Sequence, residues 1–206
     1  MVLKDMSVFP RKMRPLSLPN VLTYARIAAI PVVVALLFWP GEVAMRWYAL
    51  ALYAAAGVTD YLDGYLARLY HEQSSLGRML DPIADKLLVA ACLLMLVADG
   101  TIRSWSIWAA IVILSREILV SGLREFLAEV KVSVPVSRLA KWKTAMQLVA
   151  VGFLIAGPAG DALLPTDWTR LIGLALLWVA AILTLVTGYD YMKASIQHLV
   201  VEDERS

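Results

Sequence analysis

Residues 171–189 read LIGLALLWVAAILTLVTGY, a stretch without one charged side chain. A helix rises about 1.5 Å per residue, so this stretch nearly crosses the roughly 30 Å hydrocarbon layer of a membrane. Shorter charge-free runs precede it over residues 27–41, 47–59, 87–98, 104–115 and 144–160. Extended through flanking charges, these runs predict six transmembrane helices, near residues 17–39, 45–69, 77–98, 104–128, 139–158 and 168–195. We therefore expect an all-α integral membrane protein.

The composition agrees with a membrane protein. Of the 206 residues, 60% are hydrophobic and 17% charged, and the mean hydropathy is +0.69. A soluble domain carries about 25% charged residues and could not hide so much apolar surface. Nineteen Lys and Arg against 17 Asp and Glu give a net charge of +2, too balanced for a nucleic-acid-binding protein.

Turn-forming residues separate the apolar runs: Pro-Gly at 40–41, Asp-Gly at 99–100 and Gly-Pro-Ala-Gly at 157–160. A short polar loop is expected at 70–76. The chain then divides into three parts. They are a basic segment on the membrane surface (1–16), the six-helix domain (17–198) and a cytoplasmic tail (199–206). A cleaved signal peptide is the alternative for the first part, although no small-residue cleavage site follows its apolar residues.

The basic residues predict the orientation, because loops on the cytoplasmic side are enriched in Lys and Arg. One side of the predicted membrane receives Lys4, Arg11, Lys12, Arg14, Arg68, Arg78, Lys131, Arg138, Lys141, Lys143, Lys193 and Arg205. The other side receives Arg46, Arg103 and Arg170. Both termini are therefore expected in the cytoplasm.

Four aspartates lie inside the second and third predicted helices. Asp60 and Asp63 are three residues apart, and Asp81 and Asp85 are four apart, so each pair shares a helix face. A carboxylate at the bilayer centre costs on the order of 2.5–3.5 kcal/mol, and such residues are usually functional. All four are at the cytoplasmic ends of their helices.

The short loop predicts that these two helices are antiparallel neighbours, with both pairs at one membrane side. Four such carboxylates could hold a hard divalent cation such as Mg²⁺ or Mn²⁺. The alternative is a set of helix-end acids paired with Arg68, Arg78 and Lys86.

The four aspartates are part of a longer sequence pattern that resembles the signature of a known family. The string reads Asp60-x2-Asp63-Gly64-x2-Ala67-Arg68-x8-Gly77-x3-Asp81-x3-Asp85. It resembles the signature of the CDP-alcohol phosphotransferases, a family of integral membrane enzymes of phospholipid synthesis. Further similar stretches are Leu18–Arg26 and, for the phosphatidylglycerophosphate synthase branch of the family, Ser115–Ile118, Leu123–Glu125 and Lys141–Gln147.

The resemblance implies a six-helix fold, usually homodimeric, that transfers a phosphatidyl group from CDP-diacylglycerol to an alcohol and releases CMP. In the branch named above the alcohol is sn-glycerol 3-phosphate and the product is phosphatidylglycerol phosphate. By the same resemblance, two divalent cations are held by Asp60, Asp63, Asp81 and Asp85, and Asp85 is also the base. The CDP-diacylglycerol contacts are Asn20, Thr23, Gly64, Arg68 and Ser74.

A phosphorylated acceptor also needs cations. Arg116, Arg124 and Lys141 lie toward the cytoplasmic ends of the fourth and fifth predicted helices, and we expect them to bind glycerol 3-phosphate. The alternative for this basic cluster is contact with lipid head groups.

Other functions remain open at this point. The acceptor could instead be phosphatidylglycerol, inositol phosphate or serine. From a different class, intramembrane acids also mark divalent-cation transporters. A transport path would need polar residues across the full membrane depth, whereas these acids gather at one side.

Overall fold

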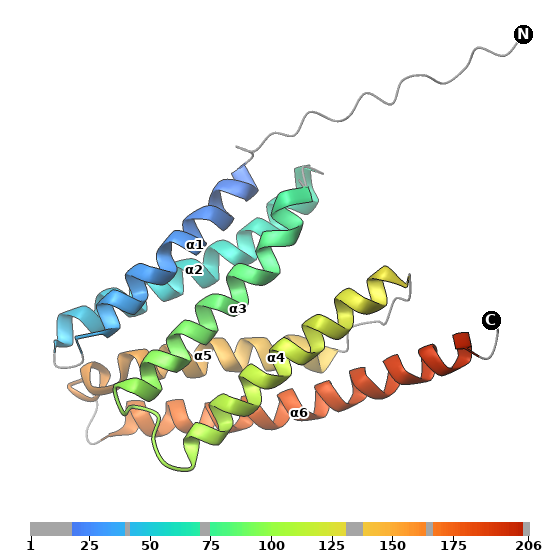
Figure 1. The fold of residues 1–206 in the computed structure, drawn as a ribbon. Coiled ribbons are helices and arrows are strands. Elements are labelled where there is room, and N and C mark those ends of the chain that lie inside the picture. The colour runs from blue at the N-terminus through green and yellow to red at the C-terminus, as the bar shows by residue number, and fades with distance from the viewer. Residues whose placement is uncertain (1–17, 40–41, 71–74, 131–137, 164–166, 204–206) are drawn as a thin grey trace, which may run out of the picture.

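The computed structural model is a bundle of long helices (Figure 1) and describes residues 18–39, 42–70, 75–130, 138–163 and 167–203. The helices are α1 (Leu18–Leu37), α2 (Val43–Tyr70), α3 (Ser75–Ala98), α4 (Ser106–Glu129), α5 (Arg138–Asp161) and α6 (Trp168–Asp203). The described residues contain no strand, so the all-α prediction is confirmed. The surface segment predicted at 1–16 lies outside the described residues.

The predicted helix boundaries are close to the observed ones, with one larger difference. Helix α6 continues to Asp203, past its predicted end at 195 and into the segment expected as a tail. Residues 196–203 include Ile, Leu and Val and contain neither glycine nor proline, the residues that commonly end a helix.

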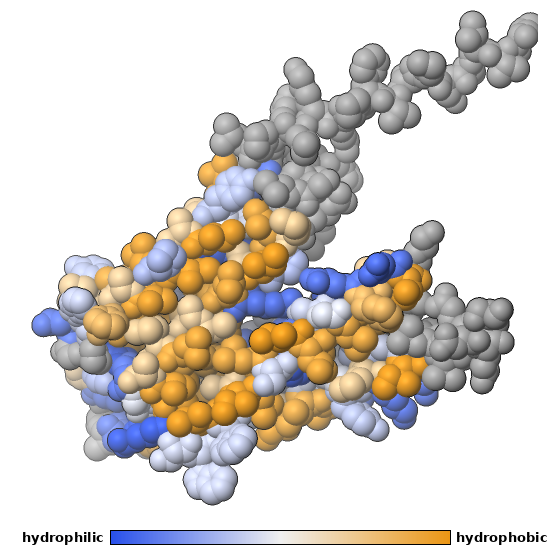
Figure 2. Space-filling model, in the orientation of Figure 1, coloured by the Kyte–Doolittle hydropathy of each residue, from blue (hydrophilic) through white to orange (hydrophobic). Residues whose placement is uncertain are grey.

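Four helices are long and apolar enough to cross a membrane, at Asn20–Leu37, Ser106–Glu129, Trp142–Asp161 and Trp168–Gln197. Helices α2 and α3 are equally long but carry several charged residues, which lower their hydropathy. Large apolar side chains cover the outside of the bundle, and Figure 2 shows them over most of the visible face.

The apolar core occupies one end of the bundle. This end holds the connections α1–α2, α3–α4 and α5–α6 (Figure 1). Its fully buried side chains include Leu37, Tyr53, Leu93, Ile113 and Leu154, from five of the helices. Because this packing joins helices from both halves of the bundle, we call it the closed end.

The opposite end, called the open end below, holds the start of α1 and the last residues of α6 (Figure 1). There α1–α3 diverge from α4–α6, and Figure 2 shows hydrophilic residues in the hollow between α3 and α4. Most of the buried polar side chains gather toward this end: Asn20, Thr23, Arg26, Lys143, Gln147, Thr184, Thr187 and Ser195.

Helix α5 bends where a turn was predicted. Gly157 has φ 36° and ψ −122°, a conformation that glycine tolerates, and Pro158 follows it. The turn predicted at 157–160 does not end the helix: the backbone leaves helical geometry at Gly157, and the helix then resumes and ends at Asp161. Proline lacks an N–H, so the carbonyl of Leu154 loses its usual intrahelical donor.

Arg46 of α2 supplies donors to this bend. Its Nη1 lies 3.2 Å from the carbonyl oxygen of Ile155 and 3.5 Å from that of Leu154. Its Nη2 pairs with Asp99 at 2.5 Å and donates to the Thr101 hydroxyl at 3.3 Å. The side chains of Arg46 and Asp99 are both 3% exposed, so this buried ion pair connects α2, the α3–α4 connection and α5.

We expect Arg46→Met to lower the free energy of unfolding by about 3–5 kcal/mol, because it leaves Asp99 as an uncompensated buried charge. Arg46→Met combined with Asp99→Leu should recover part of the loss. The measurement is equilibrium unfolding of the purified protein in mixed micelles, followed by tryptophan fluorescence. Arg103, exposed in the same connection, gives the control Arg103→Met. Equal stability of the two single variants would contradict this role.

Candidate active site

Helix α1 lies between the two acidic helices. Among the described residues, α1 packs extensively against both α2 and α3, whereas α2 and α3 make few contacts with each other. The predicted antiparallel arrangement, with the acids at one end, is confirmed, but direct packing of the two helices is not. Two facing acidic surfaces would repel each other, and α1 places a cation and a hydroxyl between them instead.

Two buried side chains of α1 each contact one aspartate, the first on α2 and the second on α3. Arg26 Nη1 lies 2.6 Å from Asp60 Oδ1, and the Thr23 hydroxyl donates to Asp81 Oδ1. The Arg26 side chain is 1% exposed and that of Asp60 is 44% exposed. Each bond uses one carboxylate oxygen, and a carboxylate has two oxygens with about four acceptor positions. Both carboxylates are therefore oriented and can still coordinate a cation.

Asp85 lies one helical turn along α3 from Asp81 and is partly buried. Negative charges from Asp60 on α2 and Glu117 on α4 act on it, together with positive charges from Arg26 and Lys86. Charges from four helices thus act on this carboxylate.

The remaining residues of the signature are only partly described. Asp63, Gly64 and Arg68 lie on α2, where the structure describes the backbone alone. Ser74 lies outside the described residues. Among the side chains that are described, no three from His, Cys, Asp or Glu gather closely enough to hold a metal ion. The hard oxygen donors of Asp60, Asp81 and Asp85 nevertheless fit Mg²⁺ or Mn²⁺ in kind.

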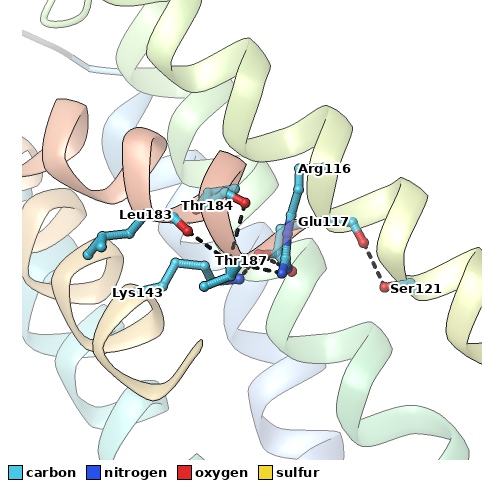
Figure 3. A network of polar contacts seen from close by, with 7 residues as sticks. All are labelled: Arg116, Glu117, Ser121, Lys143, Leu183, Thr184 and Thr187. Carbon is cyan, nitrogen blue, oxygen red and sulfur yellow. Dashed lines mark hydrogen bonds and ion pairs between the residues drawn. The ribbon is translucent and has the colours of Figure 1, made fainter. Parts of the chain in front are cut away.

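A second polar cluster joins α4, α5 and α6 (Figure 3). Glu117 of α4 forms an ion pair with Lys143 of α5. The Oε1 atom of Glu117 also lies 3.5 Å from Nη1 of Arg116. Nη2 of Arg116 donates to the Thr187 hydroxyl of α6 at 3.2 Å. That hydroxyl donates to the Leu183 carbonyl at 2.8 Å. We call Arg116, Glu117, Lys143 and Thr187 the cation cluster.

Close helix packing holds Arg116 in place. A Cβ at Gly188 of α6 would lie 3.0 Å from Arg116 Cγ and 3.1 Å from its Nε, so the arginine lies directly against the backbone of α6. Arg124, two turns later on α4, stacks over the Tyr191 ring at 5.8 Å, and its charge acts on Arg116. Lys141 lies on α5, where the backbone alone is described.

The two regions lie close enough for their charges to interact. The charge of Asp85 acts on Lys143, and that of Glu117 acts on Asp85. Oxygen donors for a cation therefore lie near buried cations for an anion, which suits a reaction between two phosphate-bearing molecules.

The sequence reasoning did not assign Arg26, Glu117 or Lys143 to the site. Each is a charged residue inside a predicted membrane helix, the same signal that had singled out the aspartates and Arg116. Applied to every charge within a span, this signal would have found all three.

Residues 16–186 match the family described as CDP-alcohol phosphatidyltransferase, and the chain belongs to that family. This agrees with the all-helical fold and with the aspartates that α2 and α3 carry at one end of the bundle.

Named relatives cover nearly the whole chain. A Rickettsia bellii protein named CDP-diacylglycerol–glycerol-3-phosphate 3-phosphatidyltransferase is 49% identical over 178 residues, 86% of this chain and 94% of the relative. One of the same name from Cereibacter sphaeroides is 37% identical over 92% of this chain and 99% of the relative. A rice protein named cardiolipin synthase (CMP-forming) is 38% identical over 93% of this chain and 61% of the relative.

Proposed function

We propose that this protein transfers the phosphatidyl group of CDP-diacylglycerol to sn-glycerol 3-phosphate, releasing CMP and forming phosphatidylglycerol phosphate. The observation that carries the proposal is the presence of an acidic region on α2 and α3 and of the partly buried cation cluster at the same end of the bundle. Full-length relatives named for this reaction support it.

The same structure supports a proposal for the membrane arrangement. We infer that all six helices span the inner membrane, because α2 and α3 run alongside the apolar α1, and apolar side chains face outward. The excess of Lys and Arg at the open end supports a cytoplasmic location for that end, for both termini and for the site. The apolar outer faces would contact lipid or a second copy in a homodimer; we expect no nucleic-acid partner.

Two divalent cations, Mg²⁺ or Mn²⁺, would be held by Asp60, Asp63, Asp81 and Asp85. Such ions neutralise phosphoryl oxygens and stabilise both the attacking and the leaving oxygen. The donors fit, because Asp60 and Asp81 are each anchored through one oxygen by α1.

Residues of the chain then bind and orient the reactants. Asp85 would take the proton of the glycerol hydroxyl as this oxygen attacks the β-phosphorus that carries the diacylglycerol. The bond between the β-phosphorus and the oxygen that bridges to the α-phosphate would break, so that CMP leaves with this oxygen and the diacylglycerol ester stays intact. Gly64 would allow close backbone approach to the nucleotide and Arg68 would contact a diphosphate oxygen. Asn20, Thr23 and Ser74 are the further proposed contacts to CDP-diacylglycerol.

Arg116, Arg124 and Lys141 would bind the phosphate of the acceptor, with Lys143 beside them. Arg116 is best placed, because the Thr187 hydroxyl and the backbone at Gly188 of α6 hold it in position. A planar guanidinium binds phosphate through two parallel hydrogen bonds.

A different acceptor is the second candidate function, since the rice relative bears the name of a cardiolipin synthase. Phosphatidylglycerol, inositol phosphate and serine are the acceptors to compare. A divalent-cation transporter is disfavoured, because buried apolar side chains fill the closed end.

The deciding experiment is a product assay. Purified protein, CDP-diacylglycerol, Mg²⁺ or Mn²⁺ and each acceptor in turn are scored by CMP release and lipid chromatography. Glycerol 3-phosphate should give the highest kcat/KM. A preference for another acceptor would overturn the assignment, and cation flux in liposomes without CMP release would indicate the transporter.

Chelation should abolish activity, and Mg²⁺ or Mn²⁺ should restore it. Asp60→Asn, Asp63→Asn and Asp81→Asn should each eliminate turnover, because an amide is a poorer ligand for a hard cation. CMP release in chelator and after metal addition is the measurement. Asp190→Asn is the control, since Asp190 is exposed on α6. Full activity in excess chelator would refute the metal role.

Asp85→Asn should lower kcat by about 10²–10⁴-fold, the usual loss on removing a general base, and by more where a metal ligand is lost too. Binding of CDP-diacylglycerol should persist, because other residues contact the nucleotide. Single-turnover rates and equilibrium binding separate the two effects. A variant that keeps most of its kcat would remove Asp85 from the chemistry.

Arg116→Ala, Arg124→Ala and Lys141→Ala should each lower kcat/KM for glycerol 3-phosphate about 10- to 150-fold, as expected for a lost charged hydrogen bond worth roughly 1.5–3 kcal/mol. KM for CDP-diacylglycerol should change by only a few-fold. Lys193→Ala is the control, because Lys193 is exposed on α6 toward the same end. Unchanged acceptor kinetics in all three variants would assign the basic residues to lipid contact.

A further inference from the structure

Glu117 provides the negative charge of the cation cluster. Its carboxylate contacts both Lys143 and Arg116, and the Glu117 side chain is 20% exposed. Lys143 has only 6% of its side chain exposed. An ammonium this deeply buried needs a counter-ion, since an unpaired charge in an apolar interior is very unfavourable.

The two cations depend on Glu117 to different degrees. Thr187 and the backbone at Gly188 hold Arg116 from α6, and its contact with Glu117 is long at 3.5 Å. For Lys143, the ion pair with Glu117 is the main electrostatic partner, ahead of Asp85. Loss of Glu117 would therefore leave Arg116 in position and Lys143 without its main compensation.

We propose that Glu117 is a resident counter-anion, which occupies the cations until the anionic group of the acceptor takes its place. This inference rests on the proposed function, because it assigns the cation cluster to the acceptor phosphate. A carboxylate with one charge can be displaced by a phosphate that carries nearly two. A neutral alcohol has no charge with which to compete. Glu117 is then a specificity-determining residue that favours phosphorylated acceptors.

The exposure of the three side chains suits this displacement. The Glu117 side chain is 20% exposed, against 13% for Arg116 and 6% for Lys143, so the carboxylate is the member of its ion pairs most open to exchange with a solute. Its departure would also remove a negative charge that acts on Asp85. Binding of the acceptor would thus exchange one anion for another near the acidic region, without leaving a buried cation unpaired.

The test is a titration of the purified full-length protein with inorganic phosphate, in uncharged detergent and metal-free buffer at constant ionic strength. Affinity and the phosphate-dependent rise in Tm are followed by tryptophan fluorescence. Glu117→Gln should have a lower Tm than wild type without phosphate. It should bind phosphate at least about tenfold more tightly, or roughly 1.4 kcal/mol, because the competing anion is gone.

Matched variants separate this role from a purely structural one. Glu125→Gln removes the same charge from an exposed position on α4 and should behave as wild type. Combining Glu117→Gln with Lys143→Met should abolish the gain in phosphate affinity. A merely structural glutamate would lower Tm by an amount that phosphate does not restore.

Equal or weaker phosphate binding by Glu117→Gln would overturn the proposal. If that variant does not fold, Glu117→Asp takes its place, since a shorter side chain holds Lys143 less well; its affinity should exceed that of wild type, and equal or weaker binding overturns the proposal. Phosphate titration requires no turnover. The assay of wild type with glycerol 3-phosphate therefore tests the proposed function separately.

Discussion

The structure depends on one constraint, which is that charges inside an apolar bundle must be paired or reach water. At the closed end, the deeply buried charges of Arg46 and Asp99 pair with each other beside a proline bend. With the helices joined there, they can diverge at the other end. The divergence gives water and polar solutes access, so carboxylates and cations can lie within an apolar helix bundle without the full cost of burial.

Helix α1 has the largest share in organising the acidic region, although none of its residues is acidic. Its buried face presents Thr23 and Arg26 to two helices that would otherwise repel each other. Orienting residues of this kind set the direction of the ligands they contact, and their loss usually impairs a site nearly as much as loss of a ligand. Helix α6 has the corresponding role for Arg116.

Much of this could be predicted from the sequence, and the exceptions have physical causes. Charge-free runs predicted the six helices, because hydrophobic length is a local property. Spacing placed the aspartates on helix faces but could not show α1 between α2 and α3, since neighbours in a bundle depend on all the packing. The Gly-Pro pair at 157–158 indicated a turn, and whether the helix resumes depends on the distant Arg46. Pairing of Glu117 with Lys143 is likewise a long-range contact that no local pattern contains.

The divergence of α3 from α4 allows a reactant dissolved in lipid and a reactant dissolved in water to reach the same site. Each acyl CH₂ drawn out of lipid costs about 0.8 kcal/mol, so extracting a whole diacylglycerol would be prohibitive. A hollow that begins at the aqueous end and lies between lipid-facing helices spares the protein that work (Figure 2). The donor can keep its tails in the bilayer while the phosphorylated acceptor stays in water. Only the few reacting atoms of the two substrates then have to come into contact.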